Sequence, residues 1–176
     1  SEARVERQLP DGIVVALQER RPTALLVGES YVLVDARGGI IKRFDNRPPS
    51  KFLSLPLVTG LSADALEREE GGELVREAIR VVDIYAQMGM DDERPLGEIH
   101  VDPVIGLTLM TQKRATEIRL GRGQYRRRLE RLKTLRRSLG EREIEPAYIL
   151  LDQDESLDRV TIGRRSSQGM ARDGAE

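Results

Sequence analysis

Cysteine and tryptophan are absent from this sequence of 176 residues, and histidine occurs once. Without cysteine, disulfide bonds, thiolate catalysis and cysteine-ligated metal sites are excluded. The lack of cysteine does not decide the compartment, because such a chain can lie on either side of a membrane. The single histidine, His100, excludes a metal site built from two histidines. It stands between Ile99 and Val101 on a predicted strand with no relay partner in view, so we expect a structural role. We expect no metal and no cofactor.

Aromatic residues and long apolar runs are also scarce. Aromatics make up 3% of the chain, so the core must be aliphatic. The longest apolar runs, residues 13–17 and 147–151, are far shorter than the roughly 20 residues that a membrane-spanning helix needs. No signal-peptide pattern opens the sequence. We therefore expect any membrane anchor to lie outside the sequence given.

Positive and negative charges are nearly balanced, with 29 basic and 30 acidic residues and a net charge of −1. This balance argues against a protein whose whole surface binds nucleic acid, although a local basic patch is compatible with it. Hydrophobic residues make up 39% of the chain, enough to build a folded core. Residues 164–176 lack periodicity and are rich in Ser, Gly and charge, so we expect a disordered tail.

Alternating apolar residues bounded by turn signals predict a series of strands, most of them joined by short turns. Two helices are predicted at residues 72–88 and 123–139, each with apolar residues spaced three and four apart and followed by a glycine, Gly89 or Gly140. The fold class is therefore α+β, with a mostly antiparallel curved sheet and two main helices packed on one face. The predicted strands are 3–8, 13–19, 23–28, 31–35, 40–44, 55–59, 97–101, 106–111, 116–120, 147–151 and 157–163.

Catalytic motifs are not found. The acidic clusters at residues 91–93 and 152–155 could in principle serve acid/base or cation chemistry, but they lack EF-hand spacing and are typical of solvated turns. The glycines at 38–39 and 121–123 match no P-loop or dinucleotide fingerprint. The segment 120–123 is interpreted as a tight turn from a strand into a helix. We predict that the protein is not an enzyme.

The second predicted helix is strongly basic, with Glu130 as its one acid against Arg122, Arg126, Arg127, Arg128, Arg131, Lys133, Arg136 and Arg137. Three interpretations remain open: a solvated polar face opposite a leucine stripe, contact with anionic lipid, cell-wall polymer or a partner, or binding of nucleic acid. We do not expect nucleic acid. The candidates for anionic contact are Arg126, Arg127 and Arg131.

Four stretches, in order, carry a resemblance to a known family. They are Val5 to Ala24 with its Pro-Asp-Gly turn and Glu-Arg-Arg-Pro-Thr-Ala segment, the Leu-Val-Asp-Ala-Arg-Gly-Gly hairpin within 31–41, Leu-Pro-Leu-Val-Thr-Gly at 55–60, and 106–121 ending in Leu-Gly. Together they resemble the periplasmic region of FtsQ/DivIB-type bacterial cell division proteins. The strand before the 106–121 hairpin often carries a tryptophan in the family, and this sequence has none. We expect the family's membrane anchor and most of its POTRA domain to lie outside the sequence given.

The resemblance implies a domain plan and a role. Residues 1–22 would be the C-terminal part of a POTRA domain, 23–163 the β domain and 164–176 the tail. The whole protein would cross the inner membrane once, outside this sequence, with this region in the periplasm at the division septum. It would catalyse nothing and would hold other division proteins, FtsB and FtsL among them.

The last predicted strand, residues 157–163, is expected at an edge of the sheet. An edge strand offers unpaired backbone groups to which another chain can add a strand, and the resemblance implies that FtsB binds there. Arg159, Arg164 and Arg165 could steer an acidic partner, or they could simply protect an ordinary edge. The candidate partner-binding residues are Leu157, Arg159, Val160, Thr161, Ile162 and Gly163.

Three rival functions stay open. The chain could be a POTRA-type module of outer-membrane assembly or secretion, although at most one incomplete unit is visible. It could bind nucleic acid through the basic helix. It could be an enzyme that uses its acidic clusters.

Overall fold

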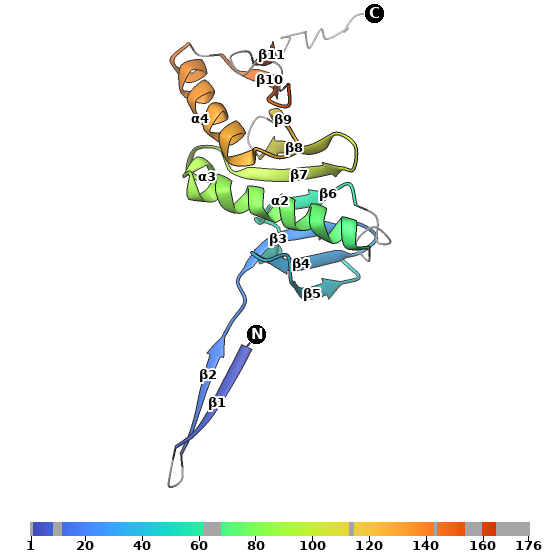
Figure 1. Ribbon diagram of the computed structural model, residues 1–176, viewed down its shortest axis with the longest axis vertical. Helices are drawn as coiled ribbons and strands as arrows, with labels where there is room; N and C mark the ends of the chain where they lie inside the picture. The colour runs from blue at the N-terminus through green and yellow to red at the C-terminus, as the bar shows by residue number, and fades with distance from the viewer. Residues whose placement is uncertain are drawn as a thin grey trace, which may run out of the picture.

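The computed structural model describes residues 2–8, 12–61, 68–112, 115–142, 144–153 and 160–164. These residues form strands and helices in the order expected from the sequence (Figure 1). The strands are β1 (Glu2–Gln8), β2 (Gly12–Gln18), β3 (Pro22–Val27), β4 (Tyr31–Asp35), β5 (Ile40–Phe44), β6 (Leu57–Thr59), β7 (Leu96–Asp102), β8 (Gly106–Thr111), β9 (Glu117–Gly121), β10 (Pro146–Leu150) and β11 (Thr161–Arg164). The helices are η1 (Ser50–Phe52), α2 (Glu69–Gln87), α3 (Met90–Glu93) and α4 (Tyr125–Glu141).

Nine of these strands form one sheet, in the order β11-β10-β9-β8-β7-β6-β3-β4-β5. Five of its neighbouring pairs are antiparallel. Three pairs are parallel, namely β9 with β10, β3 with β6, and β6 with β7. The α+β class and the mostly antiparallel sheet are therefore confirmed.

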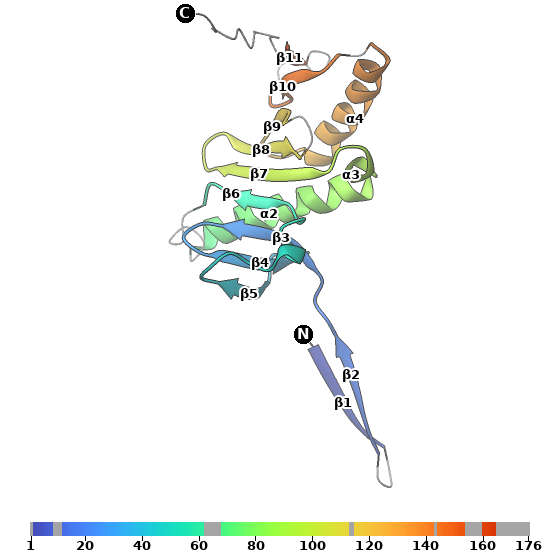
Figure 2. The same ribbon diagram turned by 180° about the vertical axis from the view of Figure 1, so that it is seen from behind.

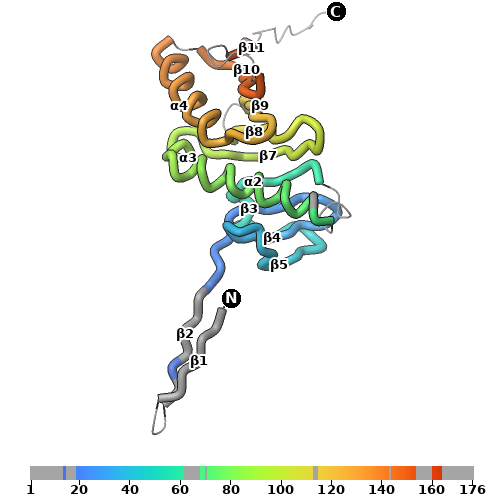
Figure 3. The backbone as a smooth tube through the Cα atoms, in the orientation of Figure 1, coloured from blue at the N-terminus to red at the C-terminus, as the bar shows by residue number. Residues whose placement is uncertain are grey.

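The two long helices are the connections that two of the three parallel pairs require, while β3 and β6 are joined through β4, β5 and η1. A parallel pair cannot be closed by a short turn and needs a crossover of about a dozen residues or more. Helix α2 connects β6 to β7, and α4 connects β9 to β10. Both helices cover the same face of the sheet, as the views from front and back show (Figures 1 and 2), and the path through α4 is easiest to follow in Figure 3.

The core lies between the two helices and this face of the sheet. Helix α2 contributes Ala78, Val81 and Tyr85, and α4 contributes Leu129 and Leu132, all fully buried. Each buried leucine is worth about 1.5–3 kcal/mol relative to an exposed one. Leu25 and Leu33, which pair across β3 and β4, are buried outside this cluster, so both faces of the sheet are covered there.

The first two strands form a separate hairpin, β1 with β2, in the register Glu2 with Gln18 through Gln8 with Gly12. The Pro-Asp part of its predicted turn lies outside the described residues, as do the predicted tail after residue 164 and the start of the last predicted strand.

Several predicted boundaries were wrong. Helix α4 includes Gly140 and ends at Glu141, because a single glycine costs only about 1 kcal/mol within a helix. The acidic cluster at 91–93 is not a loop but forms α3, and Asp91 accepts a hydrogen bond from the backbone N–H of Leu96 at 3.2 Å. Gly89, which was expected to end α2, does so in the left-handed conformation at φ 67°.

Candidate functional site: the β11 edge and the basic helix

Strand β11 is the last strand at one end of the sheet and pairs antiparallel with β10. Ile162 lies opposite Ile149, a core residue, and Gly163 lies opposite Tyr148 on the other face. In the described part of the chain no strand lies on the outer side of β11, so its outward backbone groups have no ladder partner there. Leu157 and Arg159 lie outside the described residues.

The structure brings the two sets of predicted contact residues together. Val160, just before β11, packs against the core and lines a groove of about 440 Å³ with Arg127 and Arg131 of α4. The groove floor also includes Leu135, which is partly buried. The lining thus combines apolar and cationic side chains. The other groove-lining residues are Glu130, Thr134 and Ser138.

Arg126, the third predicted cation, does not line the groove beside β11 and instead contacts α2. Its Nη2 donates to Gln87 Oε1 of α2 at 3.4 Å. It lines a second groove, of about 530 Å³, between α2 and the start of α4 together with Arg80 and Tyr125. Arg127 and Glu130 line both grooves, whereas Arg126 lines only the second.

Part of the basic character of α4 serves the fold. Arg128 is buried, and its Nη1 donates to the carbonyl oxygens of Leu120 and Arg122, which secures the turn from β9 into α4. Lys133 Nζ donates to the carbonyl of Met88 at 2.7 Å and so satisfies the end of α2. The helix is thus neither a purely solvated face nor a continuous cationic surface.

Two tyrosines tie α4 to α2. Tyr125 donates its hydroxyl to Glu77 Oε2 at 2.7 Å, and burial together with this bond raises its pKa to about 12. Tyr85 donates to the carbonyl of Arg94 at 2.8 Å, while Arg136 donates to the Tyr85 hydroxyl at 2.7 Å and stacks over its ring. Burial is also the main reason why the pKa of Tyr85 is raised.

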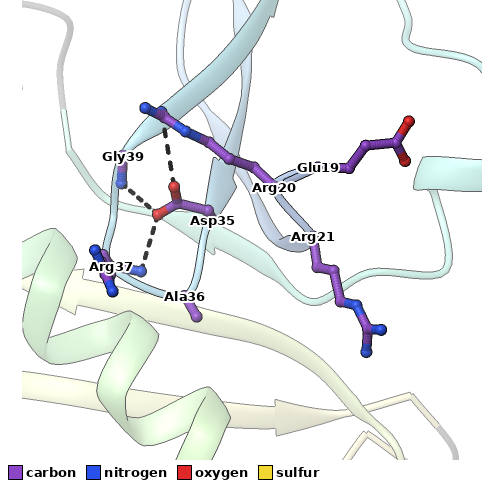
Figure 4. Close-up of a pocket in the computed structure, with 7 residues that line it drawn as sticks. All are labelled: Glu19, Arg20, Arg21, Asp35, Ala36, Arg37 and Gly39. Carbon is purple, nitrogen blue, oxygen red and sulfur yellow. Dashed lines mark hydrogen bonds and ion pairs between the residues drawn. The ribbon is translucent and has the colours of Figure 1, made fainter. Parts of the chain in front are cut away.

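A hollow of about 430 Å³ lies where the chain enters β3 beside the turn between β4 and β5 (Figure 4). Asp35 stands at its centre and accepts hydrogen bonds from the backbone N–H groups of Arg37 and Gly39, while Arg20 lies 3.7 Å from its carboxylate. The side chains of Arg21 and Glu19 point away from Asp35 (Figure 4). The interactions of Asp35 therefore stabilise the turn between β4 and β5.

The sequence missed a polar trio on the helix-free face of the sheet. Thr59 Oγ1 donates to Glu98 Oε1 at 2.5 Å and lies 3.0 Å from His100 Nδ1. Because Thr59 has a single hydroxyl proton, His100 is the donor to Thr59, so this hydroxyl is not activated as a nucleophile. The alternation of Glu98 and His100 placed them on one face, but Thr59 came from a parallel neighbour that the sequence did not reveal.

Two properties of the described residues bear on the kind of protein. They hold no group of three or more His, Cys, Asp or Glu side chains that could bind a metal ion. No helix among them is long and apolar enough to cross a membrane. The fold and its surfaces are those of an α+β domain with an open sheet edge beside a cationic groove.

Comparison with known proteins gives the family. Residues 24–152 match the model of the C-terminal region of the cell division proteins FtsQ/DivIB. The chain is 37% identical over 169 residues to the cell division protein FtsQ of Anaeromyxobacter sp. (strain K), covering 93% of this chain and 56% of that protein. It is 34% identical over 174 residues to FtsQ of Myxococcus fulvus, covering 97% of this chain and 59% of that protein.

A third relative, FtsQ of Geotalea daltonii, is 30% identical over 163 residues, covering 89% of this chain and 57% of that protein. The chain thus spans a little over half the length of these relatives. The chain belongs to the FtsQ/DivIB family of cell division proteins.

Proposed function

We propose that this region is a non-catalytic scaffold of the divisome, which binds another division protein of the FtsB or FtsL kind by adding a strand of that partner to β11. The observation that carries the proposal is the position of β11, an outermost strand whose outward backbone groups have no ladder partner in the described chain. Backbone pairing would supply affinity, and side chains beside the edge would supply selectivity.

The groove beside β11 supports the same proposal. Val160 and Leu135 offer an apolar floor, and Arg127 and Arg131 lie along it. A segment that leaves the added strand and crosses α4 would be favoured if it carried acidic residues next to apolar ones. The arginines would then act mainly on the association rate and on the choice of partner.

The proposal extends to the whole protein. Its relatives bear the name cell division protein FtsQ and are nearly twice as long as this chain. We place this region in the periplasm at the septum, held by a single inner-membrane anchor outside residues 1–176. Residues 1–22 would end a POTRA domain, for which the separate β1–β2 hairpin is the supporting observation.

Two proline variants test the strand addition. Successive N–H groups along a strand point to opposite sides, so one of Thr161 and Ile162 donates outward and the other donates toward β10. Proline at the outward position removes a docking donor and is tolerated at an edge. We expect Thr161→Pro or Ile162→Pro to keep the fold and to weaken binding by at least about tenfold, or about 1.4 kcal/mol.

The measurement is titration calorimetry with the periplasmic region of an FtsB-like division protein, with circular dichroism to follow folding. Unchanged affinity in both variants would refute strand addition at β11.

Charge reversal tests the groove. Arg131→Glu should slow association with the same partner and make it less sensitive to salt, because a rim cation acts through long-range attraction. Arg131 lines only the groove beside β11, and Arg126→Glu is the matched control, since Arg126 lines only the second groove. Equal effects of the two variants would show that the groove beside β11 has no special part.

A further inference from the structure

Tyr148 and Gly163 form an unusual pair on the helix-free face of the sheet. They lie opposite each other in the register of β10 and β11. A Cβ atom added to Gly163 would lie within 2.5 Å of three carbons of the Tyr148 ring. The ring therefore occupies the space where a side chain at position 163 would stand, and 41% of Tyr148 remains exposed.

The direction of the ring matters because β11 is the edge. Neighbouring strands lie about 4.8 Å apart, and directly opposed side chains on one face form a row across the sheet. In this row Tyr148 lies between Glu117 of β9 and Gly163, and a strand added outside β11 would supply the next member. Because Gly163 has no side chain, nothing at position 163 separates the tyrosine ring from that residue of the added strand.

We propose that Tyr148 is a specificity-determining residue of the β11 edge. Its ring, which lies over Gly163, contacts the partner residue that pairs opposite Gly163, and this partner residue is a large apolar one, with an aromatic preferred. This inference rests on the proposed strand addition. An aromatic ring on the incoming strand would cover the exposed part of Tyr148 and gain the extra attraction of paired rings. A small or charged residue would leave the ring exposed or lose its own hydration.

The selectivity is confined to one position. Two residues away the added strand would face Thr161, whose neighbour across the register is Leu150. Because Thr161 carries a side chain, that side chain separates the added strand from Leu150, and Leu150 does not contact the partner residue there. The residues between these positions point to the helix face, where Ile162 and Ile149 lie. The structure thus assigns the aromatic preference to the register position of Gly163.

A double-mutant cycle tests this assignment. The probe is the periplasmic region of an FtsB-like division protein, with each residue of its docking segment changed in turn to alanine, titrated against this chain with Tyr148 or Tyr148→Ala. Tyr148→Ala should weaken binding about three- to tenfold. Its effect should vanish with one partner variant, at a large apolar residue, and be additive with the others.

Two further variants separate recognition from a merely structural role. Tyr148→Phe keeps the ring over Gly163 and should retain wild-type affinity and coupling. Val104→Ala removes an aliphatic side chain that is 86% exposed on the turn between β7 and β8, away from the edge, and should leave binding unchanged.

The outcomes are distinct. Binding that is additive at every partner position would overturn the role of Tyr148 and leave strand addition standing. A wild-type chain that binds no FtsB-like region would overturn the proposed function and this inference with it.

Discussion

The two outermost strands of the sheet, β5 and β11, expose different groups at its edges. At one end β5 exposes Ile40, Lys42 and Arg43, its ladder with β4 is interrupted by a register shift, and Arg20 Nη1 donates to the Ile40 carbonyl at 3.3 Å. At the other end β11 presents Thr161 and Gly163 and ends at Arg164, and its ladder with β10 also contains a register shift. Charges, bulges and occupied carbonyls are the usual means by which an edge is kept from pairing with other chains.

The difference shows that an edge position alone does not identify a docking site. Both strands are outermost and both ladders contain a register shift, but β5 has two adjacent exposed cations and a carbonyl bonded by Arg20, whereas β11 carries a glycine covered by a neighbouring ring. This contrast, together with the cationic groove beside Val160, is why we assign partner binding to β11.

The largest expected effect comes from removing the core beneath the β11 half of the sheet. Leu132 of α4 is fully buried, and Leu132→Ala should lower the free energy of unfolding by about 2–5 kcal/mol. Urea denaturation measures the loss. The matched control is Leu135→Ala, which should cost less because Leu135 is only partly buried in the groove wall. Equal losses would contradict the placement of the core.

Proline substitutions on the opposite edge sharpen the comparison directly. Successive N–H groups of β5 point to opposite sides, so one of Lys42→Pro and Arg43→Pro removes an outward donor and the other removes a donor that points toward β4. The variant that loses an outward donor should fold and bind the FtsB-like region with unchanged affinity in calorimetry. A loss of about tenfold, matching that at β11, would move the docking site or divide it between the two edges.

Alkaline pH tests the hydrogen bond from Tyr125 of α4 to Glu77 of α2, which links the halves of the molecule that carry the two edges. The folded state raises the pKa of Tyr125 from 10.0 to about 12, so it holds this proton more tightly than the unfolded chain does. The resulting stability is fully present below pH 10 and is lost as the pH rises to about 12. We expect the wild type to lose stability more steeply across this window than Tyr125→Phe, as measured by urea denaturation at each pH. If the free energy of unfolding fell in parallel with pH in the wild type and in Tyr125→Phe, this hydrogen bond would be contradicted.

The smallest effect is expected at the turn between β7 and β8, which belongs to neither edge. Asp102 accepts hydrogen bonds from the backbone N–H groups of Val104 and Ile105, at 2.7 and 2.8 Å. The bonds to Ile105 and Val104 lower the pKa of Asp102 below 3.8, so their stabilisation is present above that pH and is lost as the pH falls through the folded pKa.

An NMR titration of Asp102 should show a midpoint below 3.8, and Asp102→Ala should leave partner binding unchanged. A midpoint at or above 3.8 would contradict these bonds, and weakened binding would extend the docking surface to this turn.

Much of the fold was predictable from the sequence. Alternation marked the helix face of β8 through Leu107 and Leu109, and three- and four-residue spacing marked the buried side of α4 through Leu129 and Leu132. Helix ends were less predictable, as Gly140 shows, because flanking residues can carry a helix past one glycine. The candidate site was only half predictable: Val160 and Arg127 were each singled out, but not that they share a groove.

By itself, the sequence determined the α+β class, the buried face of β8 and the likeness to the FtsQ/DivIB family. Those properties are local, because side-chain alternation and turn chemistry are set within a few residues. Tertiary structure decided the parallel placement of β6 beside β7, the open side of β11, and the seating of the Tyr148 ring on Gly163. Contacts between strands far apart in the chain depend on how the whole core packs, which no short stretch of sequence specifies.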